Sequence, residues 1–598
     1  MSADRPKSAA RRSGAAGHQP QVLREYALLA DGERAAVVGP RGDIVWLCAP
    51  HWHDPAVFAA LIGGSGTFSL APDQPYVWGG SYDEGTMIWR SRWVTRDGIV
   101  ECRETLAYPA DPHRVVLLRR VHALDRPASV TVSLEPRGDY DRTPMTELHR
   151  HASVWTARLG QLHLRLTGGG DARPHADHTR LDLHLNLPPG THHDLVLELS
   201  DRPLPDQPPD PDDTWRATET AWRDAVPALD ATLNPRDTRR SFAVLRGLTS
   251  ASGGMVAAAT TSLPERAEAG RNYDYRYAWI RDQCYAGQAA ATVAGGEPLL
   301  DAAVDFVGAR ILDHGDRLAP AYTISGDPVP DQRHLDLPGY PGGSNIVGNW
   351  VNHQFQLDAY GEALLLFAAA ARHDRLDPAG WNAVETAIRT IGERWSEPDA
   401  GIWEIEPRAW THSRLTAAAG LRAIATARSS RQAGDWLTLA DRLVADTATH
   451  ALHRDGRWQR AADDPGLDAA LLLPALRGAV PIDDPRSTAT FTAYLDALTR
   501  DGYAYRFRHD DRPLADAEGA FLLCGFLVAL THHQLGNGVE ARSWYDTTRA
   551  ATGPAQLFSE EYDAVQHQMR GNLPQAFVHA LHLETGATLS THPTQPTA

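Results

Sequence analysis

A chain of 598 residues is too long for one ordinary hydrophobic core, so two or more domains are expected. With 42% hydrophobic and 22% charged residues it has the composition of a soluble globular protein, and no apolar run is long enough to cross a membrane. The formal net charge of −17 argues against a nucleic-acid partner, which would need a basic surface. Lys7 is the only lysine, which excludes Schiff-base and P-loop chemistry, since both need a placed lysine.

Both ends of the chain are predicted to be tails, at residues 1–21 and 591–598. The N-terminal tail contains basic residues but no apolar stretch, so it does not resemble a secretory signal. The cysteines lie far apart without a CxxC pair, which indicates neither a disulfide framework nor a zinc site. They are Cys48, Cys102, Cys284 and Cys524. We therefore expect a cytoplasmic protein.

Residues 22–205 carry the signals of β-strands. The stretch "TMIWRSRWVTRDGIVECRETL" (86–106) alternates around Asp97-Gly98, a two-residue turn signal typical of a hairpin. Further short β-branched runs follow at regular spacing, which favours an antiparallel β-sandwich. The proline-rich, acidic stretch that begins at residue 201 then predicts a linker over 206–234.

Residues 235–590 carry about twelve helical stretches. They fall roughly at 237–250, 280–294, 297–313, 347–372, 379–395, 411–428, 431–449, 466–476, 486–499, 516–534, 538–551 and 572–585. Some, such as 519–530, are apolar on every face, whereas others, such as 431–449, are amphipathic. Alternating inner and outer helices predict an (α/α)6 barrel, with long loops such as 314–346 at its rim.

The segment "RNYDYRYAWIRD" (271–282) interleaves aromatic rings with charges, which suits a ligand that is both flat-faced and rich in hydroxyls. Tyr275 and Trp279 can stack on the apolar face of a sugar ring. Arg281 and Asp282 can together donate to and accept from neighbouring hydroxyls. The segment therefore predicts a sugar clamp.

Carboxylates on two loops could supply catalysis. Glu404 follows Trp403 in "GIWE", and "LFSEEYD" (557–563) contains Glu560 and Glu561. Cleavage of an acetal needs one carboxyl to protonate the leaving oxygen and a second one to act at the anomeric carbon. An apolar neighbour keeps the first carboxyl protonated near neutral pH, and Trp403 is the expected neighbour.

These motifs, together with "EGAFLLC" and "RGNLPQAFVHALHL", resemble glycoside hydrolase family 15, the glucoamylase-like and trehalase-like enzymes. Residues 26–63 similarly resemble the trehalase-like N-terminal domain of bacterial members. The chain departs from the family pattern at Ile405, where fungal glucoamylases carry a second glutamate, and at Tyr273, where tryptophan is expected. The first departure bears on how a second sugar is held.

The resemblance implies an inverting exo-hydrolase that releases glucose from the non-reducing end of α-glucosides, with no metal or organic cofactor. In that role Glu404 would be the general acid and Glu560, in preference to Glu561, the general base, with the two carboxyls roughly 6.5–9.5 Å apart. The residues assigned to substrate binding are Tyr275, Trp279, Arg281, Asp282, Trp403 and Glu561. The expected partner is a disaccharide or oligosaccharide, not nucleic acid or a membrane, and a homo-oligomer is possible.

Two alternatives stay open at this point. An inverting α-glucoside phosphorylase shares the architecture but uses phosphate as its nucleophile, and a carboxylate at Glu560 counts against it because a phosphorylase needs no base there. A catalytically silent carbohydrate-binding relative would bind sugar without turnover. Neither candidate carboxylate is missing, so nothing in the sequence favours a loss of catalysis.

Overall fold

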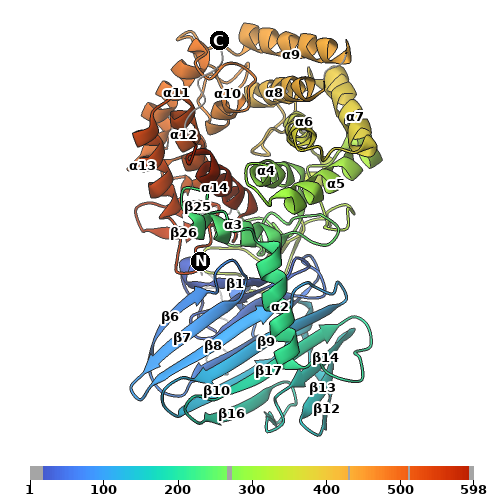
Figure 1. The fold of residues 1–598 in the computed structure, drawn as a ribbon, viewed down its shortest axis with the longest axis vertical. Helices are drawn as coiled ribbons and strands as arrows, with labels where there is room; N and C mark the ends of the chain where they lie inside the picture. The colour runs from blue at the N-terminus through green and yellow to red at the C-terminus, as the bar shows by residue number, and fades with distance from the viewer. Residues whose placement is uncertain (1–17, 266–271, 429–430, 510–511, 592–598) are drawn as a thin grey trace, which may run out of the picture.

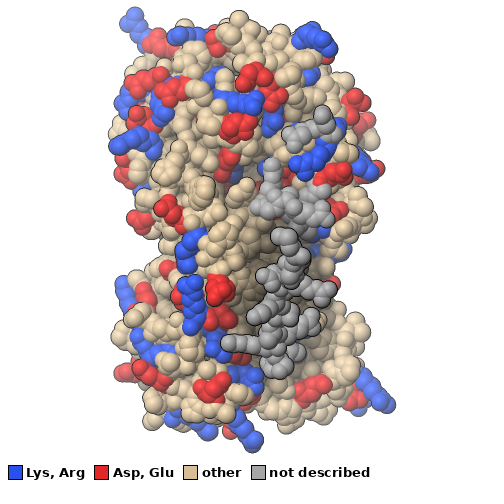
Figure 2. Space-filling model, turned by 180° about the vertical axis from the view of Figure 1, so that it is seen from behind, with Lys and Arg blue, Asp and Glu red and all other residues tan. Residues whose placement is uncertain are grey.

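The computed structural model describes residues 18–265, 272–428, 431–509 and 512–591. Figure 1 shows two parts stacked along the long axis, one built from β-sheets and the other from a ring of helices. Seen from behind, the two parts are separated by a waist, and basic and acidic side chains are intermixed over both (Figure 2). Of the helices that the structure describes, none is long and apolar enough to cross a membrane.

The N-terminal part is a sandwich of two antiparallel sheets, as the sequence predicts. One sheet has the order β1 (Ala27–Ala30), β2 (Ala35–Val38), β3 (Asp43–Cys48), β5 (Thr67–Pro72), β10 (Ala128–Glu135), β16 (Leu181–Leu187), β15 (Arg173–Pro174), with β4 (Ala56–Phe58) beside β3. The other has the order β12 (Thr146–His151), β13 (Val154–Leu159), β14 (Leu162–Thr167), β17 (His192–Ser200), β9 (Arg114–Ala123), β8 (Ile99–Leu106), β7 (Trp89–Thr95), β6 (Tyr76–Tyr82). The predicted hairpin around Asp97-Gly98 is confirmed as the β7–β8 turn.

The interval predicted to be a linker contains helix α2 (Pro211–Ala225), which lies along the second sheet (Figure 1). The acidic, proline-rich composition starts this helix, because the Asp210 carboxylate accepts the Asp213 N–H and Pro211 occupies the first turn. Trp215 and Trp222 of this helix are buried. The connection between the two parts is therefore packed onto the sandwich.

The C-terminal part is an (α/α)6 barrel, as expected. Its helices are α3 (Pro235–Leu248), α4 (Ile280–Ala290), α5 (Glu297–His314), α6 (Leu357–Arg372), α7 (Pro378–Arg394), α8 (Thr411–Ala427), α9 (Arg431–His450), α10 (Leu473–Leu476), α11 (Pro485–Leu498), α12 (Leu522–Gln534), α13 (Gly538–Arg549) and α14 (Ala576–Thr588). The even-numbered helices from α4 to α14 form the inner ring, which closes where α14 contacts α4. The odd-numbered ones cover it.

Four of the barrel helices begin later than their sequences suggest, and in α10 the 3-10 turn Ala469–Leu472 occupies the predicted start. Helix α6 begins at Leu357 and not near residue 347, because the intervening segment turns at Gly348, where φ is +80°. Helices α12 and α14 are preceded by strands β24 (Ala520–Phe521) and β26 (Gln568–Arg570) and by loop residues. These segments lie at the end of the barrel that carries the cavity described below.

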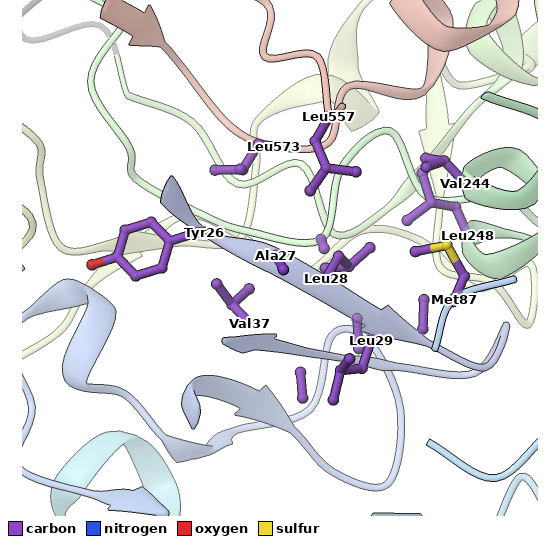
Figure 3. Packing of buried hydrophobic residues seen from close by; sticks show 14 of the residues in the cluster. Tyr26, Ala27, Leu28, Leu29, Val37, Met87, Val244, Leu248, Leu557 and Leu573 are labelled. Atoms are coloured by element: carbon purple, nitrogen blue, oxygen red, sulfur yellow. The ribbon is translucent and has the colours of Figure 1, made fainter. Parts of the chain in front are cut away.

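The two parts share one hydrophobic core. Strand β1 is buried along its whole length, and Figure 3 shows its side chains between the sandwich and barrel residues such as Leu557 and Leu573. A polar contact crosses the same boundary, where Trp46 Nε1 on β3 donates to the Ala259 carbonyl at 3.0 Å. The sandwich therefore supports the loops at one end of the barrel.

Candidate active site

A cavity of about 260 Å³ opens among the loops at the end of the barrel. Side chains from five separate segments line it, and many of them are aromatic or charged. The lining residues are Ala257, Glu265, Tyr273, Tyr275, Trp279, Arg281, Gln332, Asn349, Trp350, Gln354, Ile402, Trp403, Glu404, Ile405, Arg506, Phe507, Phe521, Glu560, Gln575 and Phe577. A concave site with aromatic walls and a few convergent polar groups is typical of a ligand-binding site.

In the clamp segment, which the structure describes over residues 272–282, Tyr273 to Arg276 point alternately to two sides. Tyr273 and Tyr275 line the cavity, whereas Asp274 and Arg276 between and after them are buried as an ion pair at 2.7 Å. Arg276 Nη1 lies 3.2 Å from the Trp52 carbonyl oxygen in the sandwich. Alternate residues of an extended segment point to opposite sides. Tyr273 and Tyr275 therefore lie on one side, and Asp274 and Arg276 on the other. The Asp274–Arg276 pair fastens the segment to the sandwich, and the rings of Tyr273 and Tyr275 face the cavity.

Glu404 is held by residues of the clamp segment. Trp279 Nε1 donates to Glu404 Oε1 at 2.6 Å, and Arg281 Nη1 lies 3.6 Å from the same oxygen. Burial raises the pKa of Glu404, while the charge of Arg281 and the hydrogen bond from Trp279 oppose the rise. Trp279 and Arg281 both face Oε1, and a hydrogen bond from Gln356 also lowers the pKa of this carboxyl. The indole that hydrogen-bonds to the carboxyl is Trp279, while Trp403, the expected apolar neighbour, lines the same cavity.

The backbone at Glu404 is left-handed, with φ at 55°. A non-glycine residue pays for this conformation, and such strain gathers at functional sites. The turn that imposes it is closed by the Glu404 N–H, which donates to the Gly401 carbonyl at 3.2 Å. The strained turn thus points the carboxyl towards Trp279.

Arg281 lines the cavity, whereas Asp282 lies behind it. Asp282 is fully buried, and its Oδ2 accepts from Arg281 Nε at 3.0 Å. Arg281 Nη1 also donates to the Ile402 carbonyl at 2.6 Å, which ties the clamp to the loop of Glu404. Asp282 is absent from the cavity wall that the structure describes, so its contact is with Arg281.

Glu560 lies in the cavity beside Tyr275. The Tyr275 hydroxyl is 3.1 Å from each oxygen of Glu560 and 3.5 Å from Glu265 Oε1. Burial raises the pKa of Glu560 well above its ordinary value, and the neighbouring charge of Glu265 raises it further. The Arg506 guanidinium and the Tyr275 hydroxyl act in the opposite direction.

Glu561 is fully buried in strand β25 (Glu561–Asp563) and does not line the described cavity. Its Oε2 accepts the Gly519 N–H at 2.8 Å, and Oε1 lies 3.7 Å from Arg506 Nη2. Trp403 does line the cavity, with its Nε1 donating to Asp468 Oδ1 at 2.7 Å. Of the two adjacent glutamates, Glu560 therefore faces the cavity and Glu561 supports its wall.

Sequence reasoning missed several residues of the cavity. Glu265 lies ten positions before Tyr275, and its place just before the clamp segment was the available signal. Arg506 comes from a stretch without a distinctive pattern, and its guanidinium lies 5.4 Å from the centre of the Trp403 ring. Trp350 lies in a stretch that the sequence predicts to be helical but that precedes α6 in the structure, and it is 67% exposed.

Among the described residues, one group of possible metal ligands contains none of the residues that line the cavity. His192, Asp194 and Asp212 bring their ligand atoms within 4.8 Å of one another on the sandwich and α2. Arg120 already bonds both carboxylates, with Nε 2.7 Å from Asp194. The Arg120 guanidinium neutralises the two carboxylates that a metal ion would need as ligands. The cluster is therefore an ion-pair network.

Comparison with known proteins places the chain among sugar hydrolases. The family described as glycosyl hydrolases family 15 matches residues 243–587, and the trehalase-like N-terminal family matches residues 9–156. The trehalases of Mycolicibacterium smegmatis and Mycobacterium tuberculosis are each 30% identical to the chain over 93% of it, and over 89% and 88% of their own lengths. A bacterial glucoamylase complexed with acarbose shares the fold, with a TM-score of 0.72 at 12% identity over 96% of each chain.

Proposed function

Since the chain belongs to glycoside hydrolase family 15, and is thus a glycoside hydrolase, we propose that it is an inverting exo-acting enzyme whose substrate is trehalose. The observation that carries the proposal is a single cavity lined by both Glu404 and Glu560. Each carboxyl is hydrogen-bonded to a different ring of the clamp segment, Trp279 for the first and Tyr275 for the second. The two-carboxyl mechanism of glycoside hydrolysis needs such an arrangement.

Glu404 acts as the general acid in this proposal. Burial raises its pKa, which keeps the carboxyl protonated at higher pH than an exposed glutamate. Trp279 and Arg281 face Oε1, and the carboxyl delivers its proton to the glycosidic oxygen. When the proton leaves, the same two donors stabilise the carboxylate that forms.

Glu560 acts as the general base that activates water at the anomeric carbon. Its position on the cavity wall favours it over Glu561, which lies behind the wall. Tyr275 donates to the carboxylate and orients it, and Arg506 favours its ionised form. The base has to be ionised for catalysis, so activity falls at low pH when Glu560 takes up a proton.

The glucose that is released binds between the aromatic walls of the cavity. Tyr275 and Trp279 meet edge to face with ring centres 5.6 Å apart, and together with Trp403 they offer apolar faces to the sugar. Arg281 offers N–H groups to its hydroxyls. Asp282 acts through Arg281, which it holds in place.

We choose trehalose over maltose-type and isomaltose-type sugars as the proposed substrate because of the relatives of this chain. Both mycobacterial relatives are trehalases, and their similarity to this chain extends over the sandwich as well as the barrel. The sandwich supports the clamp segment through Arg276, so a likeness that includes it bears on the site. A cytoplasmic location and a homo-oligomeric state stay predictions from the sequence.

The proposal is tested by incubating the purified protein with trehalose, maltose or isomaltose, each with and without phosphate, and measuring glucose. We expect glucose from trehalose without phosphate. The variants Glu404→Gln and Glu560→Gln should each lower turnover by at least about 10²–10⁴-fold. Glucose 1-phosphate formed only with phosphate would indicate the phosphorylase alternative, and binding without turnover the silent relative.

A further inference from the structure

A chain of four buried polar side chains lies behind the segment that carries Glu560. His579 and His582 come from α14, Ser241 from α3 and Tyr545 from α13, and each is at most 1% exposed. Ser241 Oγ lies 2.9 Å from His579 Nδ1 and 2.8 Å from His582 Nδ1. Tyr545 Oη lies 3.1 Å from His582 Nε2. None of the four lines the described cavity.

One backbone contact determines the direction of the hydrogen bonds among these four side chains. The Phe558 N–H lies 3.1 Å from His579 Nε2, and a backbone N–H can only donate. Nε2 of His579 is therefore the acceptor, so its proton is on Nδ1 and is donated to Ser241. The described residues offer the Ser241 hydroxyl no other acceptor, so its single proton goes to His582 Nδ1. The proton of His582 is consequently on Nε2, where it is donated to Tyr545.

Both imidazoles are neutral in this arrangement. Burial lowers the pKa of His579 well below its ordinary value, and the nearby His582 and Arg240 lower it further. Burial likewise lowers the pKa of His582 to about 3, against a small opposing effect of Asp237. A charged His579 would carry N–H groups on both nitrogens, and one of them would face the Phe558 N–H.

The hydrogen bond from Phe558 anchors the segment that bears the base. The Phe558 carbonyl accepts from the Gln575 N–H at 2.8 Å, and the Glu560 carbonyl accepts from the Leu522 N–H at 3.1 Å. Of these three anchors, the one at His579 is made by a side chain. The rings of His579 and Phe558 also pack edge to face with centres 4.9 Å apart.

We propose that His579 is a positioning residue for the general base, held by Ser241 in the tautomer that accepts the Phe558 N–H. The proposal rests on the assignment of Glu560 as the base. His579 is buried and does not line the described cavity. Its contribution is to fix the backbone two residues before Glu560, since a small displacement of a catalytic group is costly in turnover.

Two variants of His579 separate positioning from packing. His579→Leu keeps an apolar side chain of similar reach but removes the acceptor, and we expect kcat to fall about 10- to 100-fold with KM unchanged. His579→Gln places an amide oxygen near the position of Nε2 and should restore most of kcat. A folded His579→Leu variant with the kcat of the unmodified protein would overturn the proposal.

The variant Ser241→Ala is a second test of the positioning role of His579. It removes the hydroxyl that holds the tautomer, so we expect kcat to fall and KM to stay constant. Thr238→Ala is the matched control, because Thr238 is a buried hydroxyl one turn earlier on α3 whose hydrogen bonds do not reach either histidine. Equal effects of the two variants on kcat would contradict the proposal.

The tautomers are measurable without any activity assay. Nitrogen-15 NMR of the histidine-labelled full chain should show the proton of His579 on Nδ1 and that of His582 on Nε2, with assignments from single variants. A proton on Nε2 of His579 would overturn the proposal. If Glu560→Gln stays active, the base assignment is wrong while the tautomers still test the network; if it is inactive but His579→Leu is normal, only the positioning role fails.

Discussion

The indole nitrogen of Trp279 lies 2.6 Å from Oε1 of Glu404. Four residues earlier, the hydroxyl of Tyr275 lies 3.1 Å from both oxygens of Glu560. One short segment thus contacts both carboxyls in the cavity and lowers the pKa of each against the effect of burial, although the carboxyls come from loops far apart in the chain. Changes within this segment should therefore alter the pH dependence of catalysis and not only its rate.

Trp279→Phe should move the basic limb of kcat/KM to higher pH. The hydrogen bond from Trp279 lowers the pKa of Glu404, so its loss raises that pKa and the acid stays protonated to higher pH. Trp403→Phe is the matched control, because the Trp403 N–H donates to Asp468 and should leave this limb in place. A pH profile of both variants checks this, and a shift in the opposite direction for Trp279→Phe would contradict it.

Glu265→Gln should move the acidic limb of kcat/KM to lower pH. The charge of Glu265 raises the pKa of Glu560, so a neutral amide there lets the base ionise at lower pH. The limb should nevertheless stay above the ordinary glutamate range, because burial is the larger cause. An unchanged limb in this variant would show that the two carboxyls do not interact as described.

The left-handed backbone at Glu404 predicts an unusual order of stability. With φ at 55°, glycine fits this position better than alanine, so Glu404→Gly should be more stable than Glu404→Ala by about 1 kcal/mol. At Glu406, which is not among the residues with positive φ, the order should reverse. Denaturant unfolding of the four variants measures both differences, and the same order at both positions would argue against backbone strain.

Several features of the fold were predictable from local sequence, and several of the site were not. The Asp97-Gly98 turn and the helices of the barrel follow from short-range patterns. Glu265 and Arg506 enter the cavity only because distant segments meet there, which no local pattern shows. For the same reason, the local pattern does not show that Arg276 and Arg281 act differently. Arg276 bonds to the sandwich, whereas Arg281 faces the cavity.

Asp358→Asn should stabilise the protein more at high pH than at low pH. Burial raises the pKa of Asp358 from 3.8 to about 6, and neither of its oxygens has a hydrogen-bond partner among the described residues. The folded state therefore holds this proton more tightly than the unfolded chain, and the stability that the proton contributes is lost as pH rises through about 6.

Asparagine does not titrate, so its advantage over Asp358 should grow by an amount on the order of 2 kcal/mol between about pH 4 and about pH 8. Denaturant unfolding at the two pH values measures this. Asp441→Asn is the control, because Asp441 has a side chain that is 67% exposed. An advantage of Asp358→Asn that does not change with pH would contradict the burial argument.

The exposed ring of Trp350 predicts a contact with the outer part of the substrate. It is 67% exposed and lines the cavity, as does Tyr273 at 41%. Trp350→Ala should raise KM for a disaccharide about 2- to 10-fold with little change in kcat, because stacking at the rim stabilises the bound ground state and the transition state alike. Leu312→Ala, at an exposed position away from the cavity, is the control for a general surface effect.

Anomer-resolved proton NMR of trehalose hydrolysis shows whether water attacks the anomeric carbon with inversion. In the first minutes, before the anomers equilibrate, an inverting enzyme releases β-glucose from the attacked ring and α-glucose from the leaving ring in equal amounts. We predict this equal mixture in phosphate-free buffer, and its absence in Glu404→Gln and Glu560→Gln. Early release of α-glucose alone would show retention and would contradict the assignment of Glu560 as a base.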